Sequence, residues 1–486
     1  MTRHEDINCK VRELAAAVDG QVFRGECARH SGLTETPENG QPGKPDLPVC
    51  IDSRQVEPGD LFWALRGPKH DGNEFVEDAI QAGAAAVLTD LPAERVEAIV
   101  KRNPGACAVR VIETDRALTD YALCRRKKFA GQVIGVTGSV GKTTTRQMIH
   151  TVLSSRYSGS ASPKNFNNRI GVRVAMTQME PSHDYAVLEL GASQPGDIMG
   201  LASWVRPDMG VITRVGDAHL GGFGARPRVL EAKTELLAAL PPEGIAVVDG
   251  DPWLLRHARS HGRALVSVGE DAHCSVKADD VELRGGHLFF SVSGFRFRVP
   301  VWGRHHVTAA LSAIAVGRMF GIPDLEISDA LSSFQAVPMR CEVVEIRGAT
   351  IINDCYNASP QSVDAALELL GQFDSSSRRI VVLGDMLGLG DEATRLHRRA
   401  GQHAAQCGRA DLLFAIGRHA QDVIAGAYSV GMDQSHGFNY PTLEDAIPQL
   451  GREVQPGDAV LVKGSRGMSM ERVVEALSRF PSRPAA

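Results

Sequence analysis

A glycine-rich segment between a predicted strand and a predicted helix constrains the fold of this chain more than any other feature. Residues 133–137 are mostly β-branched and predict a buried strand, and residues 138–141 contain too much glycine for regular structure. After Lys142 the apolar residues recur at helical spacing, which predicts a helix to about residue 153. A strand, a glycine loop and a helix in this order surround a phosphate with backbone N–H groups.

The residue types in this loop favour a nucleotide. The segment Thr137-Gly-Ser-Val-Gly-Lys-Thr143 is a shorter form of the Walker pattern, because Val136 stands where that pattern begins with glycine. Lys142 supplies charge for the outer phosphates, and the Thr143 hydroxyl can reach Mg²⁺. An ordinary glycine turn is the alternative, but the flanking strand and helix favour a phosphate site. The predicted nucleotide-binding residues here are Thr137, Gly138, Ser139, Val140, Gly141, Lys142, Thr143 and Thr144.

Length and charge bound the remaining possibilities. With 486 residues the chain is too long for one core and predicts about three domains. A net charge of −5 gives no reason to expect nucleic-acid binding. The N-terminus lacks the apolar core of a signal peptide, and no run approaches the ~20 apolar residues of a membrane helix. We therefore predict a soluble cytoplasmic protein without nucleic-acid or membrane partners.

The cysteines do not form a metal or disulfide pattern. Nine are scattered along the chain without a Cys-x-x-Cys pair, which is typical of reduced thiols. Only Cys355 is singled out as lying beside a motif, and we interpret it as a packing residue.

The first region, residues 1–113, has the pattern of a small α/β domain. A Gly/Pro-rich stretch at 28–48 predicts a surface loop. Strands are predicted within 49–66 on both sides of a Pro-Gly turn, a helix from about Gly72 and another strand at 84–88.

The central region, residues 114–334, alternates strands with helices. A connecting helix is predicted at about 117–129, and further strands at 185–190, 209–213 and 244–248. Helices between consecutive strands predict a mostly parallel sheet. Residues 288–301 alternate apolar and polar side chains about Ser293-Gly294, which predicts a hairpin appended to that sheet.

The third region, residues 335–486, again alternates strands and helices. Strands are predicted at 350–354, 379–384, 412–416 and 459–463. This is the pattern of a dinucleotide-type α/β fold, but no Gly-x-Gly-x-x-Gly segment opens it, so nicotinamide binding is not indicated. The predicted chain is thus an α/β protein with a small N-terminal domain, a central P-loop-type domain and a C-terminal Rossmann-like domain.

Three further residues could carry chemistry beside the loop. Glu189 ends a predicted strand, where a carboxylate is well placed to hold Mg²⁺, although a solvent-exposed strand end is an equal alternative. His219 lies in a glycine-rich loop and Lys233 near the start of a helix. From the sequence alone, both are more simply surface residues than ligands.

Taken together, these segments resemble the Mur ligases, ATP-dependent amide-forming enzymes of peptidoglycan precursor synthesis. The resemblance covers nearly the whole chain. It is carried by Asp52-Ser-Arg54, Pro58-Gly59, Asp71-Gly72, Thr137–Thr143, Asn165-Phe-Asn-Asn168, Ile170-Gly171, Glu189-Leu-Gly-Ala192, Ala218-His-Leu220, Ala232-Lys-Thr-Glu235, Arg340, Asp354-Cys-Tyr-Asn-Ala358, Gly384-Asp-Met386, Val462-Lys-Gly-Ser-Arg466 and Met470-Glu471.

The resemblance implies a specific branch of this family. The Tyr-Asn-Ala, Gly-Asp-Met and Lys-Gly-Ser-Arg stretches favour the branch that adds D-alanyl-D-alanine, and the Asp-Asn-Pro-Arg of the diaminopimelate-adding branch is absent. Such an enzyme phosphorylates the terminal carboxylate of UDP-N-acetylmuramoyl-tripeptide with ATP, and the amine of D-alanyl-D-alanine attacks the acyl phosphate. The alternatives are a Mur-type or folylpolyglutamate-type ligase with another amine, and a non-catalytic nucleotide-binding relative.

The resemblance also implies roles for individual residues. Lys142, Glu189, His219 and Lys233 would be catalytic; Thr143 and Glu189 would hold one Mg²⁺, and His219 with a carbamylated Lys233 a second. Arg340 would contact phosphate, Asp354 the ATP ribose and His306 the nucleotide. The implied substrate-binding residues are Ser53, Arg54, Asn165, Asn168, Tyr356, Asn357, Lys463, Ser465 and Arg466. The partners would be small molecules, and the protein would be a monomer.

The chain departs from the family pattern where adenine is expected to bind. His306 and Ala309 stand at positions where the family usually has asparagines. An Asn side chain both donates and accepts hydrogen bonds, and alanine does neither. We therefore predict weak recognition of the adenine base.

Overall fold

The computed structural model describes residues 3–25, 47–217, 220–373 and 378–480, and it confirms an α/β fold. Nearly all of the predicted surface loop at 28–48 lies outside the described residues. The chain forms two compact units: Met1–Ile134 with Tyr157–Glu189 and Ser203–Arg206, and Gly135–Arg156 with Leu190–Ala202 and Pro207–Ala486. In the described part of the chain, no helix combines the length and the apolar character needed to cross a bilayer.

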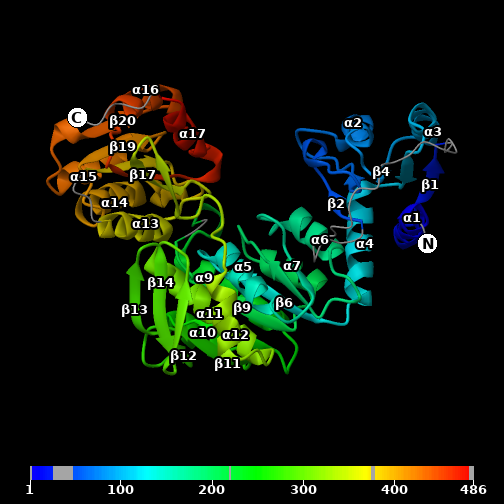
Figure 1. The fold of residues 1–486 in the computed structure, drawn as a ribbon, viewed down its shortest axis with the longest axis horizontal. Coiled ribbons are helices and arrows are strands. Elements are labelled where there is room, and N and C mark those ends of the chain that lie inside the picture. Colours follow the sequence, from blue (N-terminus) through cyan, green and yellow to red (C-terminus); the bar gives the residue numbers. More distant parts are fainter. Residues whose placement is uncertain (1–2, 26–46, 218–219, 374–377, 481–486) are drawn as a thin grey trace. The chain divides into compact units, whose positions relative to one another are not determined.

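The N-terminal region contains a five-stranded sheet in the order β1-β5-β4-β3-β2 (Figure 1). Its strands are β1 (Gln21–Arg24), β2 (Val49–Cys50), β3 (Leu61–Trp63), β4 (Ala86–Thr89) and β5 (Cys107–Arg110). Only β1 runs antiparallel to its neighbour. The helices are α1 (Arg3–Ala17), α2 (Val76–Gln81), α3 (Ala93–Arg102) and α4 (Thr114–Lys128), with 3-10 helices at Ser53–Gln55 and Gly72–Phe75.

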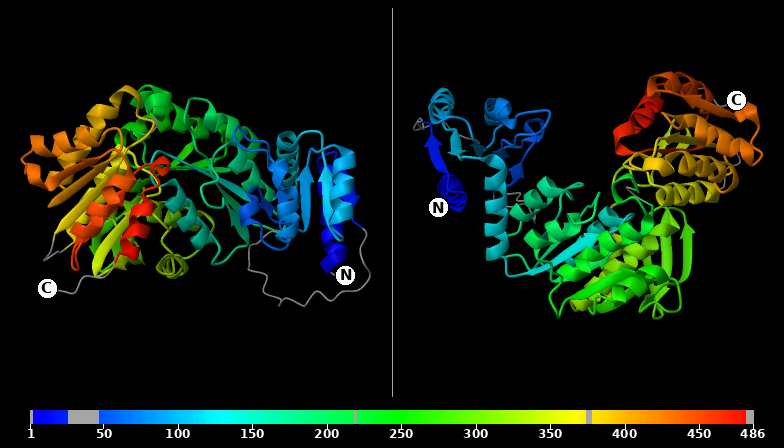
Figure 2. Two further views of the ribbon diagram at one scale, coloured as in Figure 1. Left: turned by 90° about the horizontal axis from the view of Figure 1, so that it is seen from above. Right: turned by 180° about the vertical axis from the view of Figure 1, so that it is seen from behind.

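Both faces of this sheet are buried. Trp63 and Leu88 pack in one apolar cluster with residues of α1 and α4, whereas Phe62 and Val87 pack in a second cluster with residues of α2 and α3. Successive residues of a strand point to opposite faces, so a sheet covered on both sides needs continuous apolar strands. Figure 2 shows α4 as the long cyan helix beside this sheet.

The central region contains a seven-stranded sheet in the order β12-β11-β10-β9-β6-β8-β7. Its strands are β6 (Gln132–Thr137), β7 (Gly159–Ala161), β8 (Tyr185–Glu189), β9 (Met209–Ile212), β10 (Ile245–Asp249), β11 (Ala264–Gly269) and β12 (Val276–Lys277). The pairs β7–β8, β9–β10, β10–β11 and β11–β12 are parallel, as expected. The helices are α5 (Lys142–Leu153), α6 (Arg169–Thr177), α7 (Asp197–Val205), α8 (Leu220–Phe223), α9 (Arg226–Ala239), α10 (Pro252–Arg259), α11 (Val307–Met319) and α12 (Asp324–Ser332).

The predicted hairpin forms, but it is not appended to the central sheet. Strands β14 (His287–Val292) and β15 (Phe295–Val299) turn at Ser293 and Gly294, both with positive φ, as a two-residue hairpin turn requires. They pair with β13 (Asp279–Arg284) in a separate three-stranded antiparallel sheet. The predicted attachment to the central sheet was wrong. Strand β13 is charged and mostly exposed, so no apolar pattern marks it as the hairpin's partner.

The third region contains a six-stranded sheet in the order β16-β17-β21-β18-β19-β20. Its strands are β16 (Glu342–Ile346), β17 (Ala349–Asp354), β18 (Arg379–Gly384), β19 (Leu412–Ile416), β20 (Gly437–Tyr440) and β21 (Ala459–Lys463), and only β16 is antiparallel. Its helices are α13 (Pro360–Gln372), α14 (Ala393–Gln406), α15 (Ala420–Ser429), α16 (Leu443–Glu453) and α17 (Glu471–Arg479). Apolar residues of α16 and α17 pack on one face, and Figure 1 shows α13 and α14 across the other.

Candidate functional site

The glycine loop after β6 has the conformation of a phosphate-binding turn. Gly138 has φ 143°, and a Cβ there would lie 2.0 Å from Thr213 Oγ1. Gly141 has φ 86° and immediately precedes α5. Both positions therefore require glycine. The loop leads directly into the N-terminus of α5, where N–H groups and the helix dipole favour an anion.

Hydrogen bonds to the segment after β9 fix Ser139 and Val140 of this loop. The amides of Ser139 and Val140 donate to the Arg214 carbonyl at 2.9 and 3.3 Å, and Ser139 Oγ exchanges hydrogen bonds with the backbone of Gly216. Lys142 Nζ lies over the loop and donates to the Gly138 carbonyl at 2.9 Å. The donors that best suit a phosphate are the N–H groups in the first turn of α5 and the Lys142 ammonium group, which carries a positive charge and three N–H donors.

Thr143 contacts a residue from the third region. Its buried hydroxyl accepts a hydrogen bond from Arg340 Nη2 at 2.8 Å. The Arg340 guanidinium also lies 3.9 Å from the centre of the Tyr356 ring, a cation–π distance. Three of the predicted site residues, Thr143, Arg340 and Tyr356, are thus brought together.

The carboxyl ends of β17 and β21 join in a buried ion pair. Lys463 Nζ bonds to Asp354 Oδ2 and donates to the Asn357 carbonyl at 2.9 Å. Asp354 Oδ1 accepts from the amide of Cys341 at 3.2 Å. Lys463 is only 1% exposed, so its ammonium group bonds to the protein and stabilises the positions of Asp354 and Asn357.

Ser465 and Arg466 follow β21 and have different surroundings. Ser465 is buried, and its Oγ accepts from the Leu387 amide at 2.8 Å, which ties the segment after β21 to the one after β18. Arg466 is exposed and pairs with Glu471 at 2.9 Å. Of the two, Arg466 is the one that solvent can reach.

Lys233 is buried in α9, contrary to its simplest interpretation as a surface residue. Its ammonium group donates to the Ala192 carbonyl at 3.3 Å and lies 5.5 Å from the centre of the Phe223 ring. Burial, with the charge of Lys142 nearby, lowers the pKa of Lys233 to about 7. A lysine of this kind is half neutral near physiological pH and can act as a nucleophile.

Glu189 is also buried, at the end of β8. Its Oε1 accepts from Asn167 Nδ2 at 2.8 Å, and its amide donates to Ser162 Oγ at 3.0 Å. Asn167 is not among the predicted substrate-binding residues, although it lies between two of them, Asn165 and Asn168. Asn165 is exposed, and Asn168 Oδ1 caps α6 through the Gly171 amide at 2.8 Å.

The predicted residues of the first region lie on its surface. Arg54 is exposed and is held by two hydrogen bonds to the Asp52 carboxylate, at 2.8 and 2.9 Å, and this pairing lowers the pKa of Asp52. Ser53 is the first residue of the 3-10 helix Ser53–Gln55, which also contains Arg54. Its last residue, Gln55, accepts a hydrogen bond from Lys164, so Ser53 and Arg54 lie near the segment that carries Asn165.

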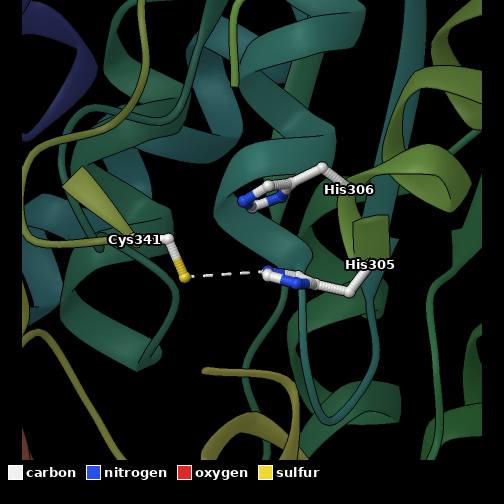
Figure 3. A group of neighbouring side chains, drawn as sticks. All are labelled: His305, His306 and Cys341. Carbon is white, nitrogen blue, oxygen red and sulfur yellow. Dashed lines mark hydrogen bonds between the residues drawn. The ribbon is translucent and has the colours of Figure 1, made fainter. Parts of the chain in front are cut away.

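The residues predicted near adenine lie at the start of α11. His306 and Ala309 are both buried, and the His306 ring lies with its centre 4.1 Å from that of His305, the two rings tilted by 44° (Figure 3). Burial lowers the pKa of both imidazoles, so both are neutral at physiological pH. His219, the other predicted histidine, lies outside the described residues.

The comparisons with known proteins cover the three regions in turn. Residues 48–119 match the Mur ligase family catalytic domain, residues 136–317 the Mur ligase middle domain, and residues 339–466 the Mur ligase glutamate ligase domain. A curated relative, UDP-N-acetylmuramoyl-tripeptide--D-alanyl-D-alanine ligase of Bacillus subtilis, is 34% identical over 436 residues, which are 89% of this chain and 93% of the relative. The chain belongs to the Mur ligase family.

Solved structures of Mur ligases share this fold. A crystal structure of MurF from Acinetobacter baumannii superimposes with a TM-score of 0.75 at 28% identity, covering 96% of this chain and 98% of that one. MurF from Thermotoga maritima in complex with ADP gives a TM-score of 0.72 at 27% identity, covering 90% of this chain and 98% of that one. The resemblance inferred from the motifs is thereby confirmed.

Proposed function

We propose that this Mur ligase joins D-alanyl-D-alanine to UDP-N-acetylmuramoyl-tripeptide at the expense of ATP. The observation that carries the proposal is the similarity to the Bacillus subtilis enzyme of that name along nearly the whole chain. The ADP complex of the Thermotoga maritima relative supports the use of ATP. The glycine loop, with Lys142 at the N-terminus of α5, supplies the phosphate-binding geometry.

The nucleotide-binding residues of the proposal are those of the loop, Thr137 to Thr144, together with Arg340, Asp354 and His306. Lys142 and Arg340 bring two positive charges to the first turn of α5, Arg340 through its hydrogen bond to Thr143. Phosphoryl transfer depends mainly on positioning and on neutralising charge. Asp354 is held by Lys463, so its carboxylate is fixed before a ribose arrives.

The metal ligands of the proposal are Thr143, Glu189, His219 and Lys233. Hydroxyl and carboxylate oxygens fit Mg²⁺, a hard cation that prefers oxygen. When bound, Mg²⁺ supplies positive charge to the transferred phosphoryl group. Asn167 would orient the Glu189 carboxylate through their 2.8 Å hydrogen bond.

Lys233 fits this group only after modification. An ammonium group repels Mg²⁺, whereas a carbamate presents anionic oxygen. Carbamylation needs the neutral amine, and the depressed pKa of Lys233, about 7, makes that form abundant. We therefore include carbamylation of Lys233 in the proposal.

The proposed chemistry has two steps. The terminal carboxylate of the tripeptide attacks the γ-phosphorus of ATP, which gives an acyl phosphate and ADP. The amine of D-alanyl-D-alanine then attacks the acyl carbon, the amide bond forms, and phosphate leaves. Lys142 and Arg340 stabilise the charge that develops on phosphate oxygens during the first step.

The remaining assignments follow the same proposal. Residues 1–113 would bind the UDP-substrate, 114–334 ATP, and 335–486 would complete the ligase site. Substrate contacts are proposed for Ser53, Arg54, Asn165, Asn168, Tyr356, Asn357, Lys463, Ser465 and Arg466. We propose a monomer that works in the cytoplasm, where ATP is available, without nucleic-acid or membrane partners.

Release of ADP tests the proposal. Purified protein is incubated with ATP, Mg²⁺, UDP-N-acetylmuramoyl-tripeptide and D-alanyl-D-alanine, and each component is omitted in turn. We expect continuous ADP release only when all are present; without the dipeptide, the acyl phosphate step yields at most one equivalent of ADP per enzyme. Repeated turnover of ATP to ADP without the peptide or without the dipeptide would overturn the ligase assignment.

A further inference from the structure

Two histidines and a cysteine meet beside α11. His305 and His306 belong to the 3-10 helix Arg304–His306, and Cys341 precedes β16 (Figure 3). One ring nitrogen of each histidine and the Cys341 sulfur all lie within 4.8 Å of one another. His305 Nε2 and Cys341 Sγ are 3.9 Å apart. The three side chains converge from segments that are 36 residues apart in the sequence.

These distances are close to those of a tetrahedral metal site. A tetrahedral zinc ion with bond lengths of about 2.0–2.3 Å holds its ligand atoms about 3.3–3.6 Å from one another. The 3.9 Å distance between His305 and Cys341 exceeds this range by a few tenths of an ångström. The remaining separations are at most 4.8 Å, so side-chain rotations that bring these atoms closer by up to about 1.5 Å would complete three corners of the tetrahedron.

The backbone holds these side chains in place. Gly303 has φ 108°, and a Cβ there would lie 2.4 Å from the His305 ring, so only glycine lets the ring fold back over this turn. Cys341 has φ 49°, which is uncommon for a residue with a side chain, and its amide donates to Asp354. His306 and Cys341 are 8% and 5% exposed, so solvent competes little for their ligand atoms.

We propose that His305, His306 and Cys341 form a Zn²⁺ site with one open coordination position. Two imidazoles and a thiolate suit a borderline-soft metal, and three protein ligands with an open position are an established arrangement for zinc. Mg²⁺ is excluded because it prefers oxygen ligands. On binding, the zinc–sulfur bond replaces the S–H bond of Cys341, and the proton passes to solvent.

The site goes beyond the proposed ligase chemistry, because none of its three side chains is among the proposed Mg²⁺ ligands. It shares His306 with the proposed nucleotide contacts: the metal takes one ring nitrogen, and the other is the atom left for the nucleotide. A bound metal would link the start of α11 to the residue that directly follows Arg340. It would thereby restrict the backbone from which the Arg340 side chain reaches Thr143.

Cobalt titration tests the site without reference to activity. The full chain, free of any histidine tag, is stripped with a chelator, kept reduced with a phosphine and titrated with Co²⁺. We expect one equivalent to produce the near-ultraviolet thiolate-to-cobalt band and the visible bands of tetrahedral cobalt. Zn²⁺ should then abolish both sets of bands, whereas excess Mg²⁺ should leave them unchanged.

Variants identify the ligands. Cys341→Ser should lose the thiolate band, and His305→Gln and His306→Gln should each weaken Co²⁺ binding at least tenfold. Cys407→Ser, an exposed cysteine elsewhere, should keep the wild-type spectrum. Circular dichroism checks that each variant folds. If Cys341→Ser does not fold, the Co²⁺ affinities of the two histidine variants test the site: wild-type affinity in both would overturn the proposal. A wild-type protein without the thiolate band, or a folded Cys341→Ser variant that keeps it, would overturn the proposal.

Discussion

Arg340 Nη2 donates a hydrogen bond to Thr143 Oγ1 at 2.8 Å, although 197 residues separate the two in the sequence. Thr143 lies in the first turn of α5, and Arg340 lies just before the first strand of the third region. The guanidinium carbon also lies 3.9 Å from the centre of the Tyr356 ring, so both the ring and the Thr143 hydroxyl hold this group in place. This contact places a positive charge at the first turn of α5, the helix that begins with Lys142.

Substitution of Arg340 should therefore slow phosphoryl transfer. Lysine keeps the charge but lacks the planar group that both stacks on Tyr356 and bonds Thr143. A hydrogen bond from a charged group contributes about 1.5–3 kcal/mol, so Arg340→Lys should lower kcat about 10- to 100-fold. Arg472→Lys, an exposed residue paired with Glu444, should leave kcat unchanged. Equal rates for wild type and Arg340→Lys would show that this arginine does not act in the reaction.

The Lys233 carbamate predicts a pH- and CO₂-dependent modification. The amine is mostly protonated below its pKa of about 7 and mostly neutral above it, so carbamylation should rise between pH 6 and 8. With ¹³C-bicarbonate, ¹³C NMR should detect a carbamate that Lys233→Ala lacks. That variant should be nearly inactive, and a small carboxylic acid should restore part of its activity. Near-wild-type activity of Lys233→Ala would refute the assignment.

The buried pair of Lys463 and Asp354 predicts a large stability effect. Lys463→Met would leave a buried carboxylate without its cation, which costs about 3–5 kcal/mol. Urea denaturation of the full chain should show a correspondingly less stable third region. Lys277→Met, which breaks an exposed pair with Asp279, should leave the urea midpoint unchanged. A small loss for Lys463→Met would mean that Asp354 is sufficiently stabilised by the Cys341 amide.

The start of α11 predicts weak selection of the base. Ala309 offers no hydrogen bond to an adenine, and the neutral His306 ring offers one donor and one acceptor. The His306 ring can therefore make at most two hydrogen bonds to the base, and each contributes about 0.5–1.5 kcal/mol. ATP should be preferred over GTP by no more than about 100-fold in competition. His306→Asn should increase that preference. A preference of several orders of magnitude in the wild type would show that another group selects adenine.

The sequence predicts the buried parallel strands well and the edge strands poorly. Strands β6, β8, β10 and β18 are continuous apolar runs, because both faces of their sheets are covered. Strands β13, β16 and β20 have exposed or half-buried residues and take their structure from the neighbouring strand. That pairing depends on contacts between distant segments, which local patterns do not report.

The candidate site shows the same limit. The loop residues and Lys233 are marked by local motifs, but the burial of Lys233 is visible only in the fold. Cys355, singled out by its position beside a motif, is fully buried against the Val462 carbonyl. No local motif marks Cys341 as a ligand, because His305, whose Nε2 lies 3.9 Å from its sulfur, is 36 residues away in the sequence.

The identity of the amine that is joined to the tripeptide decides whether this protein is a D-alanyl-D-alanine-adding ligase. UDP-N-acetylmuramoyl-tripeptide, ATP and Mg²⁺ are incubated with D-alanyl-D-alanine, diaminopimelate, L-lysine or L-glutamate in turn, and the products are analysed by mass spectrometry. The Lys142→Ala variant, folded but without the lysine at the phosphate loop, serves as the control and should be several orders of magnitude slower. We predict that wild type forms one product, the tripeptide extended by D-alanyl-D-alanine. A product with another amine, or a variant that keeps a tenth of the wild-type rate, would contradict the account.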